Sequence, residues 1–98
     1  MIYCFDLDGT LCSTLDESYK DAEPYMDRIG YVNGLFEKGH TVIIETARGT
    51  MTGKDWLCIT KDQLNGWGLK YTQLRTGIKV AADVYVDDKC VNSKNFFD

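Results

Sequence analysis

The chain has 98 residues and a formal net charge of −4, with 44% hydrophobic and 27% charged residues. This length suits one domain with a modest core, so we expect a single domain over residues 1–98. No apolar run is long enough to span a membrane, and the first residues lack the pattern of a signal peptide. We therefore expect a cytoplasmic protein without a membrane partner. The acidic balance and the lack of a Lys/Arg cluster argue against a nucleic-acid partner.

The four cysteines are Cys4, Cys12, Cys58 and Cys90, and no two of them have C-x-x-C spacing. The chain has one histidine, His40, which cannot complete a zinc-finger pattern. We expect four free thiols in a reducing compartment.

An apolar run at residues 2–5 leads into two aspartates, Asp6 and Asp8. The run predicts a short strand buried on both faces, because it is rich in β-formers and lacks polar alternation. Alternate residues of an extended segment point the same way, so both carboxylates can converge on one site. Gly9 permits a sharp turn close to a ligand, and Thr10 adds a hydroxyl. A plain Asp-Gly turn is the alternative, but it would need neither Asp6 nor the strand.

Helical and strand patterns then alternate along the chain. The expected elements are a loop or flap at 12–23, a helix that starts at 21–24 and ends at Gly39, a strand at 41–46, a helix at about 54–67, an edge strand at 71–75, a strand at 82–88, and a turn or short helix anchored by Phe96 and Phe97. This order predicts an α/β protein with a small open parallel sheet of about four strands and flanking helices.

The carboxyl ends of parallel strands lie along one edge of a sheet, where such folds bind ligands. The residues expected at that edge are Asp6, Asp8, Thr46, Asp87 and Asp88, with Lys79 on a nearby loop. This set suits phosphoryl transfer: carboxylates can hold Mg²⁺, while Lys79 and Thr46 can bind phosphate oxygens. One carboxylate could attack phosphorus and form an aspartyl-phosphate.

The segment Phe5-Asp6-Leu7-Asp8-Gly9-Thr10 resembles motif I of the haloacid dehalogenase (HAD) superfamily. Residues 43–46 resemble motif II, Lys79 resembles the motif III lysine, and residues 84–88 resemble the motif IV strand and acidic pair. All four occur in the order of that family. The resemblance implies a Rossmann-like, HAD-like sheet.

Residues 46–49, 63–64, 67–71 and 82–89 are similar to a small capless HAD group associated with polysaccharide or lipopolysaccharide biosynthesis. That group commonly has Gly-Lys-Pro where this chain has Ile78-Lys79-Val80. The spacing leaves no room for a cap domain. An uncovered site must accept a bulky substrate or receive a lid from a neighbouring subunit of a homo-oligomer, which we treat as a hypothesis.

The resemblance also implies a role for each matching residue. Asp6 would be the nucleophile and a metal ligand. Asp8 would protonate the leaving group and then activate water, while its backbone carbonyl would complete the metal shell. The remaining implied roles are Mg²⁺ binding by Asp87 and Asp88, and phosphoryl binding by Thr46 and Lys79.

Three further residues are candidate substrate contacts: Gly9, Thr10 and Arg48, the last of which could instead form a local salt bridge. The function expected from the whole pattern is a Mg²⁺-dependent phosphatase for a small phosphomonoester, such as a sugar phosphate. One alternative is a phosphotransferase or polynucleotide phosphatase of the same fold. Another is a non-catalytic module that binds a phosphorylated ligand or a metal.

Overall fold

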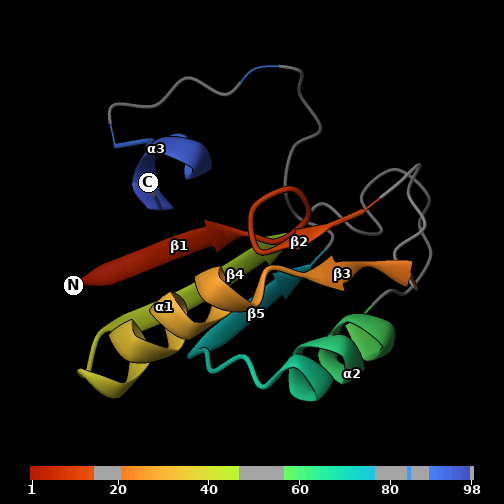
Figure 1. Ribbon diagram of the computed structural model, residues 1–98. Coiled ribbons are helices and arrows are strands. Elements are labelled where there is room, and N and C mark those ends of the chain that lie inside the picture. The colour runs from red at the N-terminus through yellow and green to blue at the C-terminus, as the bar shows by residue number, and fades with distance from the viewer. Residues whose placement is uncertain (15–20, 47–56, 77–83, 85–88, 98) are drawn as a thin grey trace.

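The computed structural model describes residues 1–14, 21–46, 57–76, 84 and 89–97. The elements among them, in chain order, are β1 (Ile2–Asp6), β2 (Cys12–Ser13), β3 (Glu23–Pro24), α1 (Met26–Glu37), β4 (Thr41–Thr46), α2 (Leu57–Trp67), β5 (Gln73–Thr76) and α3 (Ser93–Phe97) (Figure 1).

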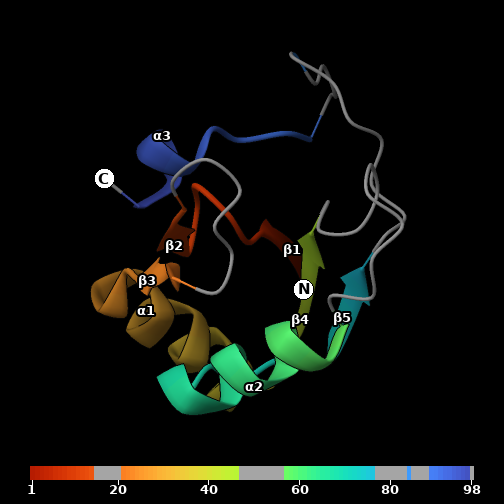
Figure 2. The same cartoon turned by 90° about the vertical axis from the view of Figure 1, so that its right-hand side faces the viewer.

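Three of these strands form a parallel sheet in the order β1-β4-β5. Each new strand is added on the same side of the previous one, so crossovers of one hand carry α1 and α2 to the same face (Figure 2). The predicted α/β class, with an open parallel sheet flanked by helices, is confirmed. Of the predicted strands, the one at 82–88 lies outside the described residues, apart from the exposed Val84.

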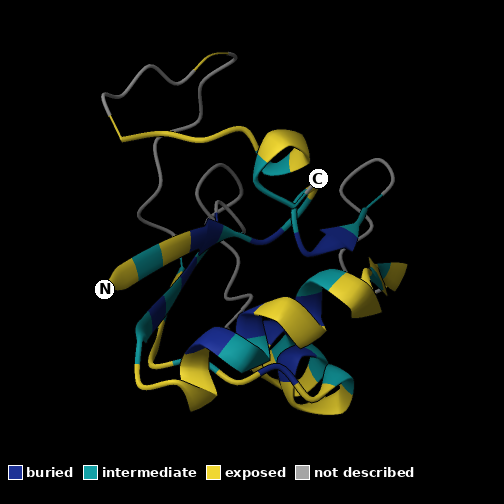
Figure 3. Ribbon diagram, turned by 60° about the vertical axis from the view of Figure 1, so that its left-hand side comes forward, coloured by how far each residue is buried: buried dark blue, intermediate teal, exposed yellow. Residues whose placement is uncertain are grey.

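The core lies between the sheet and these two helices (Figure 3). Along β4, alternate side chains are buried, because only one face of the strand meets α1 and α2. The buried apolar residues are Phe5, Leu7, Leu11, Cys12, Ile29, Val32, Leu35, Val42, Ile44, Leu64 and Leu69.

The prediction that β1 is buried on both faces is wrong for the described residues. Phe5 is buried toward the helices, whereas Ile2 is 72% exposed and Cys4 is also exposed. The reason is topological, since both described crossover helices cover the same face of the sheet. An apolar run therefore overstated the burial of this strand.

The predicted start of the first helix is also wrong. Asp21 does not cap α1; the N-cap is Tyr25, which makes no side-chain cap hydrogen bond. Pro24 instead belongs to β3, which pairs antiparallel with β2, and the Tyr25 N–H donates to the Leu11 carbonyl at 2.9 Å. Strand β3 thus takes the place of the helix start that was predicted at residues 21–24. The segment 12–23, which was predicted to be a loop, forms paired strand residues at both of its described ends.

The ends of both helices follow the prediction. Gly39 and Gly68 have φ of +92° and +74°, the left-handed backbone that terminates helices and favours glycine. Asn33 of α1 secures the second of these turns, because its amide donates to the Gly68 carbonyl at 2.9 Å and accepts from the Lys70 N–H at 2.7 Å. The predicted start of α2 at 54–56 lies outside the described residues.

The short C-terminal helix α3 is held by aromatic rings, as predicted for Phe96 and Phe97. The Phe96 ring centroid lies 5.6 Å from that of Phe5 on β1, and the Phe97 centroid lies 5.8 Å from that of Tyr31 on α1. All four cysteines are free thiols. Among the described residues, none of the helices has the length and apolar character needed to cross a membrane.

Candidate functional site

The loop that follows β1 is folded around one carbonyl group. The Leu7 carbonyl accepts hydrogen bonds from the backbone N–H groups of Thr10, Leu11 and Cys12 at 3.2, 2.8 and 3.3 Å. Gly9 has a φ of +85°, which a residue with a side chain would adopt only under strain, and its N–H donates to the Cys12 carbonyl at 2.8 Å. The chain therefore reverses direction within a few residues of Asp8.

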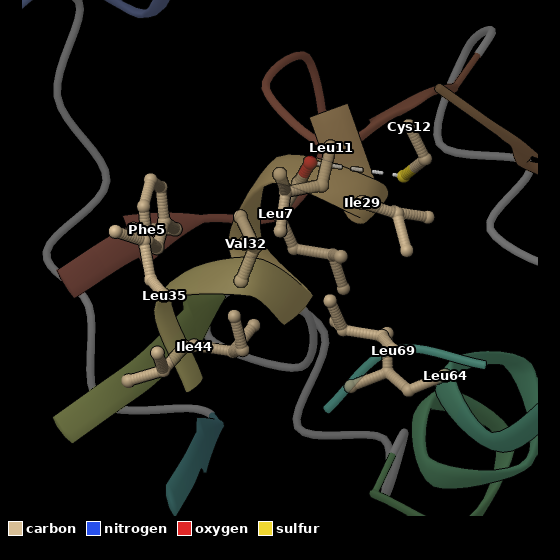
Figure 4. Close-up of a cluster of buried hydrophobic side chains, with 11 residues drawn as sticks. Phe5, Leu7, Leu11, Cys12, Ile29, Val32, Leu35, Ile44, Leu64 and Leu69 are labelled. Carbon is tan, nitrogen blue, oxygen red and sulfur yellow. Dashed lines mark hydrogen bonds between the residues drawn. The ribbon is translucent and has the colours of Figure 1, made fainter. Parts of the chain in front are cut away.

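Apolar side chains anchor this loop in the core. Leu7, Leu11 and Cys12 are each fully buried, and Figure 4 shows them gathered with Ile29 of α1. The Cys12 Sγ also donates to the Leu7 carbonyl, at 3.7 Å. Because Phe5 and Leu7 are buried on either side of Asp6, and Leu7 and Leu11 are buried before and after Asp8, the backbone at both aspartates is anchored in the core.

The two predicted aspartates lie at the carboxyl end of β1, and each is bonded to a hydroxyl. Thr10 Oγ1 donates to Asp6 Oδ2 at 3.3 Å. Thr46, which ends the neighbouring strand β4, donates from its Oγ1 to Asp8 Oδ2 at 3.4 Å. Thr46 is 1% exposed, so this bond between two residues 38 positions apart in the sequence is buried on the Thr46 side. The structure therefore pairs Thr10 with Asp6 and Thr46 with Asp8.

The other oxygen of Asp8 is held by residues of the following hairpin. Thr14 Oγ1 donates to Asp8 Oδ1 at 2.6 Å, and the Cys12 thiol donates to the same oxygen at 3.5 Å. Both carboxylate oxygens of Asp8 thus accept hydrogen bonds from neighbouring side chains. The geometry restricts the rotation of this side chain.

Arg28 ties helix α1 to the same loop. Its Nη1 donates to the Thr10 carbonyl at 2.8 Å. Its guanidinium carbon lies 5.1 Å from the Tyr25 ring centroid and 4.9 Å from that of Phe97. The cation therefore lies within cation–π distance of two aromatic rings while it donates to the loop backbone.

Four predicted site residues lie outside the described residues: Arg48, Lys79, Asp87 and Asp88. Their place at the site remains a prediction from the sequence. Gly9 and Thr10 lie on the loop where they were predicted, and Gly9 is exposed at the turn.

The described donors suit a hard cation in kind, since carboxylate and backbone carbonyl oxygens are the ligands that Mg²⁺ prefers. Asp6 and Asp8 both lie at the end of β1 and are only partly buried. Within the described ranges no group of three or more His, Cys, Asp or Glu side chains forms a metal cluster. A complete carboxylate set would need the acids predicted at 87–88.

Sequence reasoning did not find Thr14, Cys12 or Arg28. Thr14 is six residues from Asp8 and returns to it only because the Gly9 turn and the β2–β3 pairing reverse the chain. The available signal was Gly9, which permits a turn, followed by the hydroxyl residues Thr10, Ser13 and Thr14. Arg28 had no sequence signal beyond its place in the first turn of α1.

Comparison with solved structures shows that the chain is similar to the crystal structure of an MCSG target from Vibrio cholerae. The two share 25% sequence identity and a TM-score of 0.85, over 98% of this chain and 86% of the other. No family model matches the chain, and no curated protein matches it. The similarity supports the small α/β fold.

Proposed function

We propose that this protein is a Mg²⁺-dependent phosphatase that hydrolyses a phosphomonoester through an aspartyl-phosphate intermediate. The observation that carries the proposal is the pairing of Asp8 with Thr46 across the ends of β1 and β4, with Asp6 and Thr10 beside it. Two carboxylates and two hydroxyls at the carboxyl edge of a parallel sheet suit the binding and transfer of a phosphoryl group.

Each described residue has a distinct role in this proposal. The Asp6 carboxylate attacks phosphorus, and the bond from phosphorus to the leaving oxygen breaks as Asp8 gives that oxygen a proton. Water then attacks the phosphoryl group on Asp6 and loses its proton to Asp8, which restores both side chains. Thr46 donates a hydrogen bond to a phosphoryl oxygen, and Thr10 orients the Asp6 carboxylate.

Residues outside the described ranges complete the proposed site. Asp6 and the Asp8 carbonyl would hold Mg²⁺ together with Asp87 and Asp88, and Lys79 would bind a phosphoryl oxygen. Bound Mg²⁺ would supply positive charge that offsets the negative charge of the phosphoryl oxygens. A sugar phosphate is the substrate class that the sequence resemblance favours.

The test is phosphate release with and without Mg²⁺, from 4-nitrophenyl phosphate and a panel of sugar phosphates. Wild type is expected to need the metal, and Asp6→Asn is expected to lose activity by roughly 10³-fold or more because the nucleophile is gone. Asp62→Asn is the matched control. It removes the charge of an exposed aspartate on α2, and its activity should equal that of wild type.

Three outcomes are informative. Mg²⁺-dependent turnover that Asp6→Asn abolishes and Asp62→Asn retains would support the proposal. Turnover that survives Asp6→Asn would overturn the mechanism. Binding of Mg²⁺ by wild type without turnover of any phosphate would favour the non-catalytic module instead.

A further inference from the structure

Helix α1 holds the loop after β1 through two consecutive carbonyl groups. The Tyr25 N–H, at the N-cap of the helix, donates to the Leu11 carbonyl at 2.9 Å. Arg28 Nη1, three residues later, donates to the Thr10 carbonyl at 2.8 Å. Residues three apart are neighbours on a helix surface, so both donors face the loop. The first turn of α1 therefore fixes the loop backbone at Thr10, whose hydroxyl bonds to Asp6.

Among the hydrogen bonds of Thr10 in the described part of the chain, the one from Arg28 is the shortest. The Thr10 N–H donates to the Leu7 carbonyl at 3.2 Å, and its hydroxyl donates to Asp6 Oδ2 at 3.3 Å. A hydrogen bond from a charged donor to a carbonyl is also stronger than one from a neutral N–H. The backbone of Thr10 is therefore restrained more by α1 than by its own loop.

The guanidinium of Arg28 has little freedom to move away from Thr10. Its central carbon lies 5.1 Å from the Tyr25 ring centroid and 4.9 Å from that of Phe97. Both distances are within the range of cation–π attraction. The next residue, Ile29, is buried in the core, so the backbone of this turn is anchored as well. The donor is thus preorganised for the Thr10 carbonyl.

We infer that Arg28 is a positioning residue for the proposed nucleophile, and that it acts through Thr10. This inference rests on the proposed phosphatase function and adds a residue to it. By holding the Thr10 carbonyl, Arg28 sets the place of the Thr10 hydroxyl, which in turn orients the Asp6 carboxylate. A carboxylate that rotates more freely is less often aligned with phosphorus, so its loss of order slows the chemical step.

The first test compares kcat and KM for 4-nitrophenyl phosphate in the presence of Mg²⁺. Arg28→Met keeps much of the side-chain stem and should lower kcat roughly 10- to 100-fold, while KM should stay within about 3-fold of wild type. Arg28→Lys keeps a charged donor for the Thr10 carbonyl, and it should recover kcat to within about 5-fold of wild type. Lys61→Met removes an exposed cation from α2; it is the matched control and should behave as wild type.

A double-mutant cycle tests whether Arg28 acts through Thr10. Thr10→Val removes the hydroxyl that bonds to Asp6, and it should lower kcat by a similar factor. Because the two residues form one chain of contacts, adding Arg28→Met to Thr10→Val should slow the enzyme by less than about 3-fold more. A cation that acted only by attracting the phosphate would give the same factor in both backgrounds.

A second readout needs neither Mg²⁺ nor substrate. Hydrogen exchange of the loop amides that donate to the Leu7 carbonyl reports how firmly the loop is held. Arg28→Met should speed their exchange roughly 10-fold more than that of the β4 amides, whereas Thr10→Val and Lys61→Met should not. The comparison with β4 separates a local effect from a general loss of stability.

The outcomes separate this inference from the proposed function. If wild type releases no phosphate, or if Asp6→Asn is as active as wild type, the proposed function fails and the catalytic role of Arg28 falls with it. If those two behave as proposed, unchanged loop exchange in Arg28→Met overturns the role of Arg28. A higher KM without a lower kcat, equal factors in the two backgrounds, or no recovery in Arg28→Lys overturns it too. Thermal unfolding of each variant checks that it is folded under the assay conditions.

Discussion

Two segments pack beside β1, and they are held by different forces. The loop and hairpin after the strand, residues 7–14, are held by directional hydrogen bonds to the Leu7 carbonyl and to Asp8, in addition to the buried side chains of Leu7, Leu11 and Cys12. Helix α3 is held by rings whose centroids lie 5.0–6.3 Å apart. Hydrogen bonds fix angles as well as distances, whereas aromatic contacts tolerate several geometries. The contrast is what we expect if the loop must hold reacting groups and α3 need only cover the rings beneath it.

The largest effect should come from removing the anchor of the loop. Leu7→Ala deletes a fully buried side chain between the two aspartates, and it should lower the free energy of unfolding by about 3 kcal/mol. It should also reduce phosphate release beyond the loss of folded protein, because Asp6 and Asp8 lose their common support. Urea unfolding and activity at matched folded fractions check both effects. Leu74→Ala, at a half-buried position on β5, is the control and should cost less stability and leave activity unchanged.

The next effect concerns the aromatic attachment. Phe96→Ala removes a half-buried ring that contacts Tyr3, Phe5, Tyr31 and Phe97, and it should cost about 2 kcal/mol of unfolding free energy. Activity per folded molecule should stay within about 3-fold of wild type, since the hydrogen bonds described for the Asp8 carboxylate come from the hairpin and from β4. Denaturant unfolding and the phosphatase assay measure the two quantities separately.

The matched control is Phe36→Ala, which removes an exposed ring from α1 and should change stability by less than about 0.5 kcal/mol. If Phe96→Ala lost activity as severely as Leu7→Ala, the division between a site-forming loop and a covering helix would be wrong.

Arg28 joins the two segments, so it tests how independent they are. Arg28→Met keeps much of the side-chain stem but removes the hydrogen bond to the Thr10 carbonyl and the stacking on Phe97, and it should cost about 1 kcal/mol. A double-mutant cycle with Phe97→Leu should show a coupling of roughly 0.5 kcal/mol from the lost cation–π contact. The exposed Arg75 of β5 supplies the control Arg75→Met, which should show no coupling. Equal coupling for both arginines would mean that Arg28 does not link α3 to the loop.

Much of this arrangement follows from local sequence signals. The strand at residues 41–46 is confirmed with the predicted bounds, because consecutive β-branched residues favour a strand that packs one face on a core. Gly39 and Gly68 end their helices as predicted, since only glycine adopts their backbone angles readily. The placement of Asp6 and Thr46 at the carboxyl ends of neighbouring strands follows from parallel topology, whereas the hydrogen bond from Thr46 to Asp8 also depends on the loop after β1.

What the sequence did not predict depends on contacts between distant segments. Helix α1 begins at Met26 and not at the predicted residues 21–24, because residues 23–24 pair with β2. No local capping signal in the sequence reveals this pairing. The exposure of Ile2 depends on which face the crossover helices cover, and an apolar run carries no information about that. Thr14 contacts Asp8 only because the β2–β3 hairpin folds back, and the sequence gives no local signal for that contact.

The smallest effect should come from an ion pair remote from both segments. Glu37 of α1 accepts a hydrogen bond from the Lys70 ammonium, and this bond and the positive charge together hold the pKa of Glu37 below its usual range. Because the pKa is lower in the folded state, the pair stabilises the fold above the unfolded value of about 4.3. The stabilisation is lost as the pH falls through the lower folded value. Both side chains are exposed, so salt should also weaken the pair.

Thermal unfolding of wild type and Glu37→Gln at several pH values tests this pair. The Tm of wild type should exceed that of the variant slightly near neutral pH, and the two should converge in acid and in high salt. The rate of phosphate release should have the same pH dependence in both proteins, because Glu37 lies on α1 away from the strand ends that carry Asp6 and Asp8. A Tm difference that persisted in acid would mean that the Glu37→Gln substitution acts by some means other than the lost charge. A pH–rate profile that differs between wild type and Glu37→Gln would mean that the charge of Glu37 affects the site that carries Asp6 and Asp8.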